Sequence, residues 1–590
     1  MSKLLGRLPG ALLVALLAIA SYPGADLAAL ATRLAPRPAA ARTTPGGALE
    51  WLHVEHPRGA TPFIADAEGR RVELRGTVAA GLVDYWSGTA EDSSQPPPLF
   101  PISPAAYAGA CPANHLTIRE PPLCRNDFAE MRALGFNVVR LALSWSLLEP
   151  EPGRYSAEYL DRIAQVVGWA RDQGIYVILD MHENAYSRYV PRPARPSLPG
   201  GSLPSLADQT GAPRWATLTD GLPGDKFLGQ RELSFSVGAA FTNFWFNTRV
   251  DGVGLEDHYL GAVAALARRF KDESAVAGFG AFNEPWPGLV APPAADDLLI
   301  YPFYRRLIDA VTGVADGARC PIGFPALPIC GHPSLGVDDR RHIFFLEADH
   351  LREVTDLPTS LPLPISSYPN LAFSIHPYTH KYTADALAGQ DPRKSPYPPG
   401  GYDQAYGTAE AEARSIDAAL FVSEFGNEPA LDHLLLANEL REQDRHGIGA
   451  TYWPWKENCG GDTWGIYAPP LGNVRTFCAY QRRGVPTGAE PENGCLRLSK
   501  ELLLARPTVL AAVGTDLRYS YDPATGAFRL TATAARNNTL ATLVLVPREI
   551  AGAISQPSVA LADGSRTVGL TPTGAYTLTI APAPLRGSGC

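Results

Sequence analysis

The sequence predicts a (β/α)₈ barrel of the TIM type followed by a small C-terminal all-β sandwich. Three observations lead to this fold class. Continuous apolar segments alternate with segments of helical periodicity, eight of the apolar segments are strand-like, and after about residue 505 short alternating strands replace this pattern. No glycine-rich turn of the dinucleotide-binding type follows any strand, which disfavours an open doubly wound sheet.

Eight apolar segments are the expected barrel strands, because strands that alternate with helices pair in parallel and eight of them close a barrel. They are residues 72–80, 136–144, 175–181, 275–282, 342–348, 370–376, 418–424 and 448–455. Helices are predicted between several of them, over residues 128–134, 159–174, 255–270, 297–314 and 430–444. Pro302 is expected to kink the helix over 297–314 or to mark its start.

The C-terminal part has the pattern of a β-sandwich. Residues 517–534 read as two alternating strands around a turn at 522–526, and short strands without helices follow. No aromatic stripe is present there, so we expect this part to support the barrel. The 590 residues therefore divide into a signal peptide (1–20), a lead-in or linker (21–61), the barrel domain (62–505) and the β-sandwich domain (506–590).

The N-terminus predicts export. Lys3 and Arg7 precede the apolar segment 11–20, and Ala18-Ile19-Ala20 fits a signal-peptidase site. Ten apolar residues are too few to span a bilayer as a helix, and an uncleaved anchor that extends through residues 25–34 is the alternative. We therefore expect a secreted protein, either extracellular or periplasmic.

Composition and charge describe a globular protein. Hydrophobic residues make up 45% of the chain and charged residues 19%. The formal net charge of −9 is spread without a basic run, and nucleic-acid binding needs a basic footprint. We therefore expect no nucleic-acid partner, and we expect a monomer.

The eight cysteines agree with export. Cys111/Cys124 and Cys320/Cys330 each bracket a short Pro-rich loop and predict local disulfides. None of the cysteines has the spacing of a zinc site, so we expect no metal role for them. The pairing of the remaining cysteines stays open; these are Cys459, Cys478, Cys495 and Cys590.

Polar residues gather where the predicted strands end. In a (β/α)₈ barrel the catalytic side chains project from the C-terminal ends of the strands. The residues at those ends are Arg140, His182, Glu183, Asn283, Glu284, Glu347, His376, Tyr378, Glu424 and Trp453. Two carboxylates that face one pocket suit the cleavage of a glycosidic bond, since one donates a proton to the leaving oxygen and the other attacks the anomeric carbon.

The neighbouring residues fit supporting roles in that chemistry. Burial and the second negative charge are expected to raise the pKa of the acid, while Arg140 keeps the nucleophile ionised. His376 and Tyr378 are expected as hydrogen-bonding neighbours. Asn283 is expected to hold the sugar 2-hydroxyl, a contact that strengthens in the transition state. Trp286, just after the Asn283-Glu284 pair, is expected in the pocket wall.

Other roles for these residues were weighed. A lone Glu at the end of a strand is commonly a cap or an ion-pair partner. His182-Glu183 does not begin an HExxH zinc motif, because position 186 is Tyr. Trp453 and Trp455 alternate on one strand, so one of them faces the barrel and the other the helices. Glu347 fits either the pocket or a salt bridge at its rim.

The ordered set of residues resembles the pattern of glycoside hydrolase family 5. That set is Arg140, His182, Asn283-Glu284-Pro285, His376-x-Tyr378, Glu424 and Trp453. Between about residues 65 and 505 the finer texture is similar to the endoglycoceramidases of that family, and the all-β tail is similar to the sandwich that follows their barrel. The segments that carry this similarity are 135–155, 178–189, 212–221, 241–247 and 283–288.

The resemblance implies that Glu284 is the acid/base and Glu424 the nucleophile, with net retention and without a metal or other cofactor. The chain departs from the family pattern at two places. The sequence HEN at 182–184 replaces the expected HQD, and the Pro-rich, Cys-bracketed insertion at 92–124 is unfamiliar. Both departures bear on the substrate rather than on the mechanism.

The expected function is that of a secreted retaining β-glycosidase that cleaves glycosphingolipids between glycan and ceramide. The apolar segments 215–221, 241–246 and 286–293 suggest a lipid-receiving surface, and transient contact with a membrane surface is expected. The alternatives are an exo-acting glucosylceramide or steryl-glucoside β-glucosidase, or an endo-β-glucanase. A non-catalytic carbohydrate- or membrane-binding barrel is a further alternative. A mildly acidic pH optimum is expected.

Overall fold

A computed structural model gives the three-dimensional structure. It describes residues 49–84, 101–109, 111–112, 122–191, 210–224, 232–289, 296–314, 335–359, 365–395, 401–456, 464–468 and 495–588. The predicted signal segment, the Cys320/Cys330 pair and most of the insertion at 92–124 lie outside the described residues. All described residues belong to one compact unit, Thr43–Cys590.

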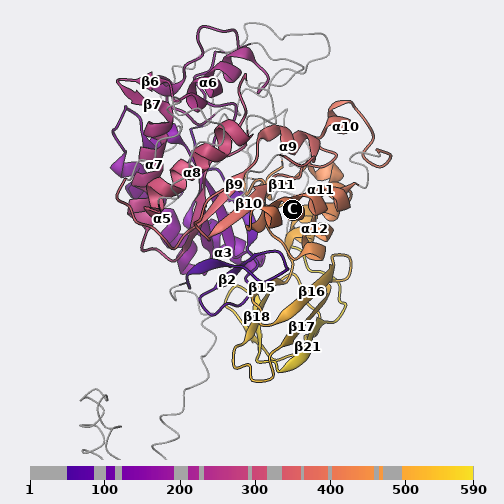
Figure 1. Ribbon diagram of the computed structural model, residues 1–590. Coiled ribbons are helices and arrows are strands. Elements are labelled where there is room, and N and C mark those ends of the chain that lie inside the picture. The colour runs from indigo at the N-terminus through magenta and orange to yellow at the C-terminus, as the bar shows by residue number, and fades with distance from the viewer. Residues whose placement is uncertain are drawn as a thin grey trace, which may run out of the picture. The chain divides into compact units, whose positions relative to one another are not determined.

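Eight parallel strands close a barrel, which confirms the predicted fold (Figure 1). Each predicted strand segment overlaps one of them, with β11 extending one residue beyond its predicted segment, and the pairing of β12 with β3 closes the ring. The strands are β3 (Arg75–Ala79), β4 (Val138–Leu143), β5 (Tyr176–Met181), β8 (Val276–Gly280), β9 (Ile343–Glu347), β10 (Leu371–Ile375), β11 (Ala419–Phe425) and β12 (Gly449–Tyr452).

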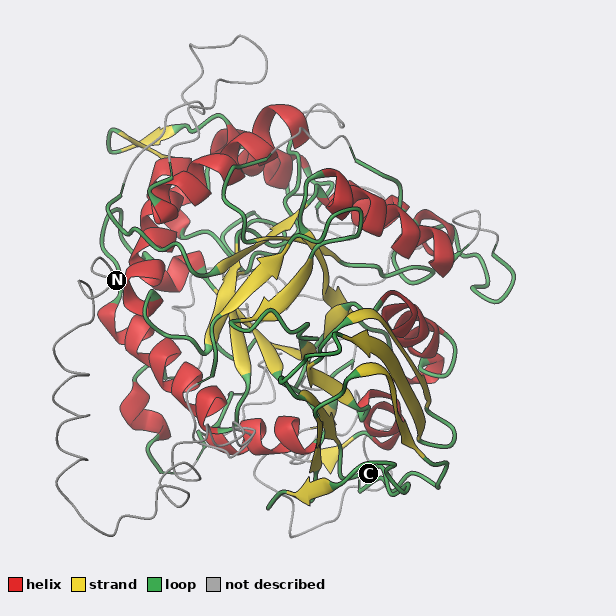
Figure 2. Cartoon of the chain, turned by 60° about the horizontal axis from the view of Figure 1, so that its bottom comes forward, coloured by secondary structure: helices red, strands yellow, loops and turns green. Residues whose placement is uncertain are grey.

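Helices surround the strands, as Figure 2 shows in red around the central yellow strands. Pro302 lies in the first turn of α8, directly after a single π-helical turn at Asp296–Ile300, so it marks the start of the helix as predicted. The helices are α3 (Arg125–Ala133), α4 (Trp145–Leu148), α5 (Ala157–Asp172), α6 (Phe235–Trp245), α7 (Leu255–Phe270), α8 (Tyr301–Thr312), α9 (His350–Thr355), α10 (Ala384–Leu387), α11 (Tyr402–Ser415), α12 (Leu435–His446) and α13 (Leu498–Leu504).

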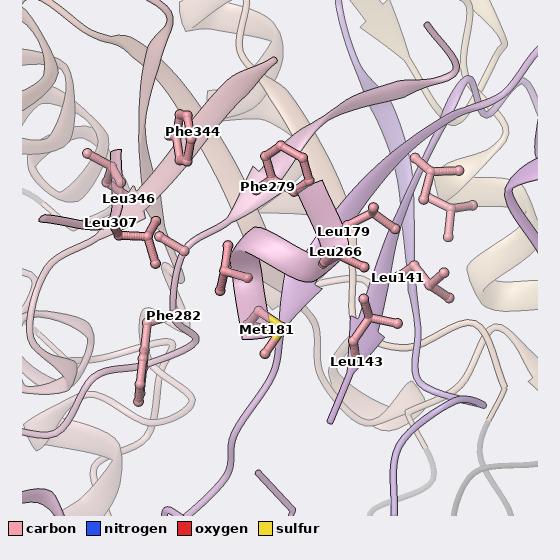
Figure 3. Packing of buried hydrophobic residues seen from close by; sticks show 14 of the residues in the cluster. Leu141, Leu143, Leu179, Met181, Leu266, Phe279, Phe282, Leu307, Phe344 and Leu346 are labelled. Carbon is pink, nitrogen blue, oxygen red and sulfur yellow. The ribbon is translucent and has the colours of Figure 1, made fainter. Parts of the chain in front are cut away.

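The two-residue period of the strands separates core from site. Leu141, Leu179 and Met181 belong to the large apolar cluster between strands and helices. Figure 3 shows these side chains together with Leu266 of α7 and Leu307 of α8. The alternate positions of the same strands hold the inward-facing polar residues described below.

A short hairpin covers the N-terminal end of the barrel. β1 (Leu52–Glu55) pairs antiparallel with β2 (Phe63–Asp66), and its buried side chains Leu52 and Val54 pack with inward residues of the barrel such as Phe345. The prediction of a poorly packed linker up to residue 61 is therefore wrong for residues 52–55, which form a packed strand. The hairpin forms because its alternate apolar residues close the bottom of the barrel core.

The C-terminal part consists of two antiparallel sheets, as predicted. One has the order β15-β18-β20-β19 and the other β16-β17-β21. Val509 and Val544 of the first sheet share a core with Phe528 and Leu530 of the second. The strands are β15 (Thr508–Ala511), β16 (Thr515–Asp522), β17 (Ala527–Ala534), β18 (Thr542–Val546), β19 (Ser558–Ala560), β20 (Arg566–Leu570) and β21 (Gly574–Ile580).

One predicted disulfide is present. Cys111 and Cys124 are bonded, with their Cα atoms 5.8 Å apart. The bond ties Cys111, inside the insertion, to Cys124 at the start of α3. In the part of the chain that the structure describes, no helix has the length and apolarity needed to cross a membrane.

Candidate active site

The carboxyl ends of the barrel strands bring all the predicted site residues together. Arg140 on β4 lies at the centre of this cluster and is 1% exposed. Its guanidinium donates to Glu424 Oε1 at 2.5 Å, to Asn283 Oδ1 at 2.7 Å and to Glu347 Oε1 at 3.0 Å. It also donates to Asp180 Oδ1 at 2.9 Å. One cation therefore fixes the ends of four other strands.

Glu424 is held by two donors, one on each oxygen. Arg140 binds Oε1, and the Tyr378 hydroxyl donates to Oε2 at 2.8 Å. The register between β11 and β12 shifts between Val422 and Phe425. Such an irregularity re-aims a side chain, and here Ser423 and Glu424 both reach the site, since Ser423 donates to Glu347.

Glu284 lies between two imidazoles. His376 Nδ1 is 2.7 Å from Oε1, and His350 Nδ1 is 3.5 Å from Oε2. The Glu284 backbone has φ of 41°, in the left-handed region, and its N–H donates to Glu347 Oε2 at 2.7 Å. A non-glycine residue in this region is strained, and the hydrogen bond that the Glu284 N–H donates to Glu347 helps to hold it there.

The charge state of Glu284 differs from the expectation. Burial alone would raise its pKa, but the His350 imidazolium and the hydrogen bond from His376 outweigh burial and lower it to about 2. The prediction that burial and the second carboxylate raise this pKa is therefore wrong. Burial would lower the pKa of His376, yet the charges of Glu347 and Glu424 raise it well above its usual range.

Asn283 has a fixed orientation. Its Oδ1 accepts from Arg140, and its Nδ2 donates to the Glu183 carbonyl at 2.8 Å. The Asn283 amide has a second N–H that can donate a hydrogen bond. Glu183 is buried, which raises its pKa well above its usual range, and its Oε2 accepts from the Tyr186 amide. The backbone carbonyl of Glu183 thus supports the position of Asn283, and the Tyr186 amide holds the Glu183 side chain.

Trp453 and Trp455 face opposite sides of their strand, as expected. Trp453 stacks on His182 with ring centroids 5.3 Å apart and an interplanar angle of 7°. Trp455 is buried on the helix side, where its Nε1 donates to Asp127 of α3 at 2.9 Å. Trp286 is largely buried, and its ring meets the edge of His350 at 6.0 Å. Trp453 therefore belongs to the site and Trp455 to the core.

The open question about Glu347 has an answer. This side chain is 4% exposed and touches Arg140, the Glu284 amide and Ser423. It therefore lies inside the pocket and not in a salt bridge at the rim. Its two oxygens connect the arginine cluster to the backbone of Glu284.

Besides Ser423, three titratable residues of the cluster were not predicted. Asp180 pairs with Arg140 and accepts from His182 Nδ1 at 3.0 Å. An Asp inside the otherwise apolar segment 175–181 was an available signal for it. His350 and Glu353, which accepts from the His376 amide at 2.7 Å, lie on α9 and carry no strand-end signal.

The aromatic stretch 241–247 does not line an open surface. Phe241, Phe244 and Trp245 are buried in the core of α6, α7 and α8. Trp245 donates from Nε1 to the Trp286 carbonyl at 2.8 Å. The expectation of a lipid-receiving surface is wrong for this stretch except at Phe246, which is 40% exposed.

The geometry of the cluster suits a two-carboxylate reaction. A carboxylate oxygen of Glu284, a ring nitrogen of His376 and a carboxylate oxygen of Glu424 lie within 4.8 Å of one another. Retaining glycosidases hold their two carboxyl groups about 5–5.5 Å apart, whereas inverting enzymes separate them by about 6.5–9.5 Å. The same three groups also meet the distance requirement of a metal site.

The closed barrel and its paired carboxylates define the class of protein, which is that of the (β/α)₈ glycoside hydrolases. The family model described as Cellulase (glycosyl hydrolase family 5) matches residues 124–459, more than half of the chain. The chain therefore belongs to glycosyl hydrolase family 5.

Several known proteins are similar to this chain. Endoglycoceramidase I of Rhodococcus hoagii (strain 103S) is 32% identical over 154 residues, which are 26% of this chain and 27% of that protein. A glucosylceramidase of Aspergillus fumigatus is 24% identical over 285 residues, which are 41% of this chain and 33% of that protein. The chain thus matches only about a quarter to a third of the length of these two relatives.

Two solved structures match over nearly the whole chain. The crystal structure of an endogalactoceramidase has a TM-score of 0.65 and 29% identity, and covers 90% of this chain and 100% of that one. Endo-glycoceramidase II from Rhodococcus sp., in a complex with ganglioside GM3, has a TM-score of 0.63 and 23% identity, with coverage of 89% and 100%. The second match shows a shared fold.

Proposed function

We propose that this protein is a retaining β-glycosidase that cleaves glycosphingolipids between the glycan and the ceramide. The observation that carries this proposal is that a carboxylate oxygen of Glu284 lies within 4.8 Å of a carboxylate oxygen of Glu424. In this assignment Glu424 is the nucleophile and Glu284 the acid/base.

In the first half-reaction an oxygen of Glu424 attacks the anomeric carbon, and the bond from that carbon to the glycosidic oxygen breaks. Glu284 gives its proton to the departing oxygen, so that the aglycone leaves as an alcohol. Arg140 and Tyr378 each bind one oxygen of Glu424 and hold the side chain in place until the glycosyl-enzyme ester forms. Glu284 is ionised in the resting site. The proton that it gives to the departing oxygen therefore comes from His376, whose Nδ1 is hydrogen-bonded to Glu284 Oε1.

In the second half-reaction a water molecule attacks the same carbon from the side that the aglycone left. Glu284 accepts the proton of that water, and the bond between carbon and Glu424 breaks. Two displacements at one carbon give net retention. Asn283 is placed to hold the sugar 2-hydroxyl through both steps, because its orientation is set by Arg140 and the Glu183 carbonyl.

Exposed apolar side chains on the loop after Glu284 and at the start of α6 support a lipid aglycone. Leu289, five residues after Glu284, is 55% exposed, and Phe235 at the start of α6 is 60% exposed. Leu289 packs on α6, since its amide donates to Thr242 Oγ1 at 2.9 Å. The leaving group lies beside the acid that protonates it, so an apolar leaving group meets an apolar rim. The names of the similar endoglycoceramidase and endogalactoceramidase agree with this substrate class.

A second candidate is an exo-acting β-glucosidase on glucosylceramide or steryl glucosides. It is favoured by the similarity to fungal glucosylceramidases and by a sterylglucosidase of Cryptococcus neoformans that has the same fold at a TM-score of 0.58. The same two carboxylates serve either activity. The difference lies in how many sugars the glycone side accepts.

A substrate panel separates these functions. We expect the wild type to release the intact glycan and free ceramide from gangliosides and lactosylceramide. Glu424→Gln is expected to reduce this release by roughly 10⁴-fold or more, whereas Glu410→Gln on α11 keeps the wild-type rate. Release of free glucose alone, from glucosylceramide or steryl glucoside, contradicts the endo activity and favours the second candidate. Hydrolysis of cellooligosaccharides alone indicates a β-glucanase.

A further inference from the structure

A third buried carboxylate, Glu347, has no role in the mechanism derived so far. It is the last residue of β9, the fifth strand of the barrel. This strand lies between β8, which leads to Glu284, and β10, which leads to His376. The side chain of Glu347 is therefore placed between the acid/base and the imidazole that supplies its proton.

One oxygen of Glu347 holds the backbone of Glu284. The Glu284 N–H donates to Glu347 Oε2 at 2.7 Å, and the φ of Glu284 is 41°. Such a left-handed backbone costs a non-glycine residue about 1–3 kcal/mol and persists only where its surroundings hold it. Pro285 follows directly, and the residue before a proline favours an extended backbone instead. Glu347 thus binds the amide of the strained residue itself.

The other oxygen of Glu347 faces the ring of His376. His376 Nε2 lies 3.2 Å from Glu347 Oε1, while Nδ1 lies 2.7 Å from Glu284 Oε1. The buried imidazole is therefore placed between two carboxylates, with one at each ring nitrogen. Burial would lower the pKa of His376, but the charge of Glu347 raises it. Glu347 thus favours both the orientation and the protonated form of this ring.

Two more donors fix the Glu347 carboxylate. Its Oε1 accepts from Arg140 Nη2 at 3.0 Å and from the Ser423 hydroxyl at 3.2 Å. Both oxygens of Glu347 therefore face donors. A glutamine has one accepting oxygen and one donating NH2 group, so it cannot serve both sides at once. Arg140 would keep its contacts with Glu424, Asn283 and Asp180 after such a substitution.

We propose that Glu347 is a positioning residue for the acid step, which holds the strained backbone of Glu284 and the ring of His376 against each other. Glu347 makes and breaks no bond in the reaction. Its loss slows proton transfer to the leaving oxygen and leaves the attack by Glu424 intact, because Arg140 still binds the nucleophile. The inference rests on the proposed role of Glu284 as the acid/base.

The test compares kcat/KM on the phenyl and dinitrophenyl β-glycosides of the sugar that the wild type releases. Phenol needs a proton to leave, whereas dinitrophenol does not. We expect Glu347→Gln to lose about 100-fold on the phenyl glycoside and less than about threefold on the dinitrophenyl glycoside. Glu347→Asp, which keeps the charge but draws the carboxylate back from the Glu284 amide, should show the same selectivity. Glu439→Gln, a buried glutamate on α12 that accepts from Tyr406, is the matched control with unchanged rates.

A double-mutant cycle shows whether Glu347 acts through Glu284. Once Glu284→Ala has removed the acid, we expect Glu347→Gln to change kcat/KM on the phenyl glycoside by less than about threefold. Equal losses on both leaving groups, no loss on either, or an undiminished loss in the Glu284→Ala background each overturn the inference. If Glu284→Ala alone keeps the wild-type rate on the phenyl glycoside, the acid/base assignment of the proposed function is wrong, and the inference falls with it.

Discussion

At the scale of single residues, the site depends on one arginine that binds several buried carboxylates. Arg140 contacts Asp180, Glu347 and Glu424, and all four side chains are nearly buried. Burying several carboxylates is costly unless each has a cation or a hydrogen bond. The sequence showed that Arg140 ends a strand, but the partners come from four other strands, so their contacts depend on the closure of the barrel.

Tyr378 tests the support of the nucleophile. Its hydroxyl donates to Glu424 Oε2 at 2.8 Å. We expect Tyr378→Phe to lower kcat by about 10- to 100-fold, because a hydrogen bond to a charged group is lost beside the reacting oxygen. The unfolding midpoint should change little. Tyr402→Phe, which removes a bond from α11 to the Thr379 carbonyl, is the matched control. Equal effects of the two substitutions on kcat would contradict this role.

At the scale of elements, the end of β8 shows why the motif before Glu284 is glycine-rich. A Cβ on Gly280 would lie 2.4 Å from Asp180 Oδ1, which is the oxygen that accepts from Arg140. Gly280 therefore leaves the space in which the Asp180 carboxylate reaches its arginine. The sequence GFGAFNEP identified a strand end but gave no reason for this glycine.

We expect Gly280→Ala to lower both activity and stability. The added methyl group displaces Asp180, which costs about 1–3 kcal/mol of unfolding free energy and disturbs Arg140. Gly407→Ala on α11 is the control, since nothing lies within 4 Å of its added Cβ. It should stabilise the protein by about 0.5–1 kcal/mol. Denaturant unfolding and kcat/KM measure both effects, and an active, fully stable Gly280→Ala would refute the clash.

The carboxyl of Asp296, next to the start of α9, is expected to make the stability of the protein depend on pH. The Asp349 amide donates to Asp296 Oδ1 at 3.1 Å. Burial and the charge of Asp349 raise the pKa of Asp296 from 3.8 to about 9. Between these values the folded protein binds more protons than the unfolded chain, so this group makes stability fall as pH rises.

Asp296→Asn removes this dependence and keeps the accepting oxygen. We expect the variant to match the wild type in thermal midpoint near pH 4 and to exceed it increasingly toward pH 9. Melting curves across that range measure the difference. A difference that stays constant or shrinks with rising pH would show that Asp296 does not hold its proton in the folded protein.

At the scale of the whole molecule, the sandwich is joined to the barrel by a buried polar cluster. The Tyr519 hydroxyl of β16 donates to Glu73, and Arg75 Nη2 donates to that hydroxyl and to Asp444 at 3.1 Å each. The Glu73 amide also donates to the Val509 carbonyl at 3.0 Å. These contacts lie at the end of the barrel where β3 begins, opposite the site.

We expect Tyr519→Phe to lower the unfolding free energy by about 1–3 kcal/mol, because it leaves a buried acceptor on Glu73 short of a donor. The value of kcat should not change. Tyr521→Phe, which loses a bond to the Ala505 carbonyl, should cost about 1 kcal/mol. A loss of activity in Tyr519→Phe at temperatures where the protein is folded would mean that the sandwich acts on the site.

Most of the fold could be predicted from the sequence, because long apolar runs are typical of the strands of a parallel sheet. The hairpin at residues 52–66 was not, since its few apolar residues sit in an Ala-, Pro- and Arg-rich lead-in. The charge state of Glu284 was also inaccessible. It depends on His350 and His376, which approach Glu284 only when the ends of the fourth to sixth strands meet.

Trapping the covalent intermediate tests the central claim most directly. Glu284→Ala should form the ester with a dinitrophenyl β-lactoside and hydrolyse it slowly, since the base for water is missing. Intact-protein mass spectrometry followed by peptide mapping should find one lactosyl group, on the peptide that contains Glu424. The wild type should release lactose of retained configuration. A lactosyl group on another residue, or a product of inverted configuration, would contradict the assignment of Glu284 and Glu424 as the catalytic pair.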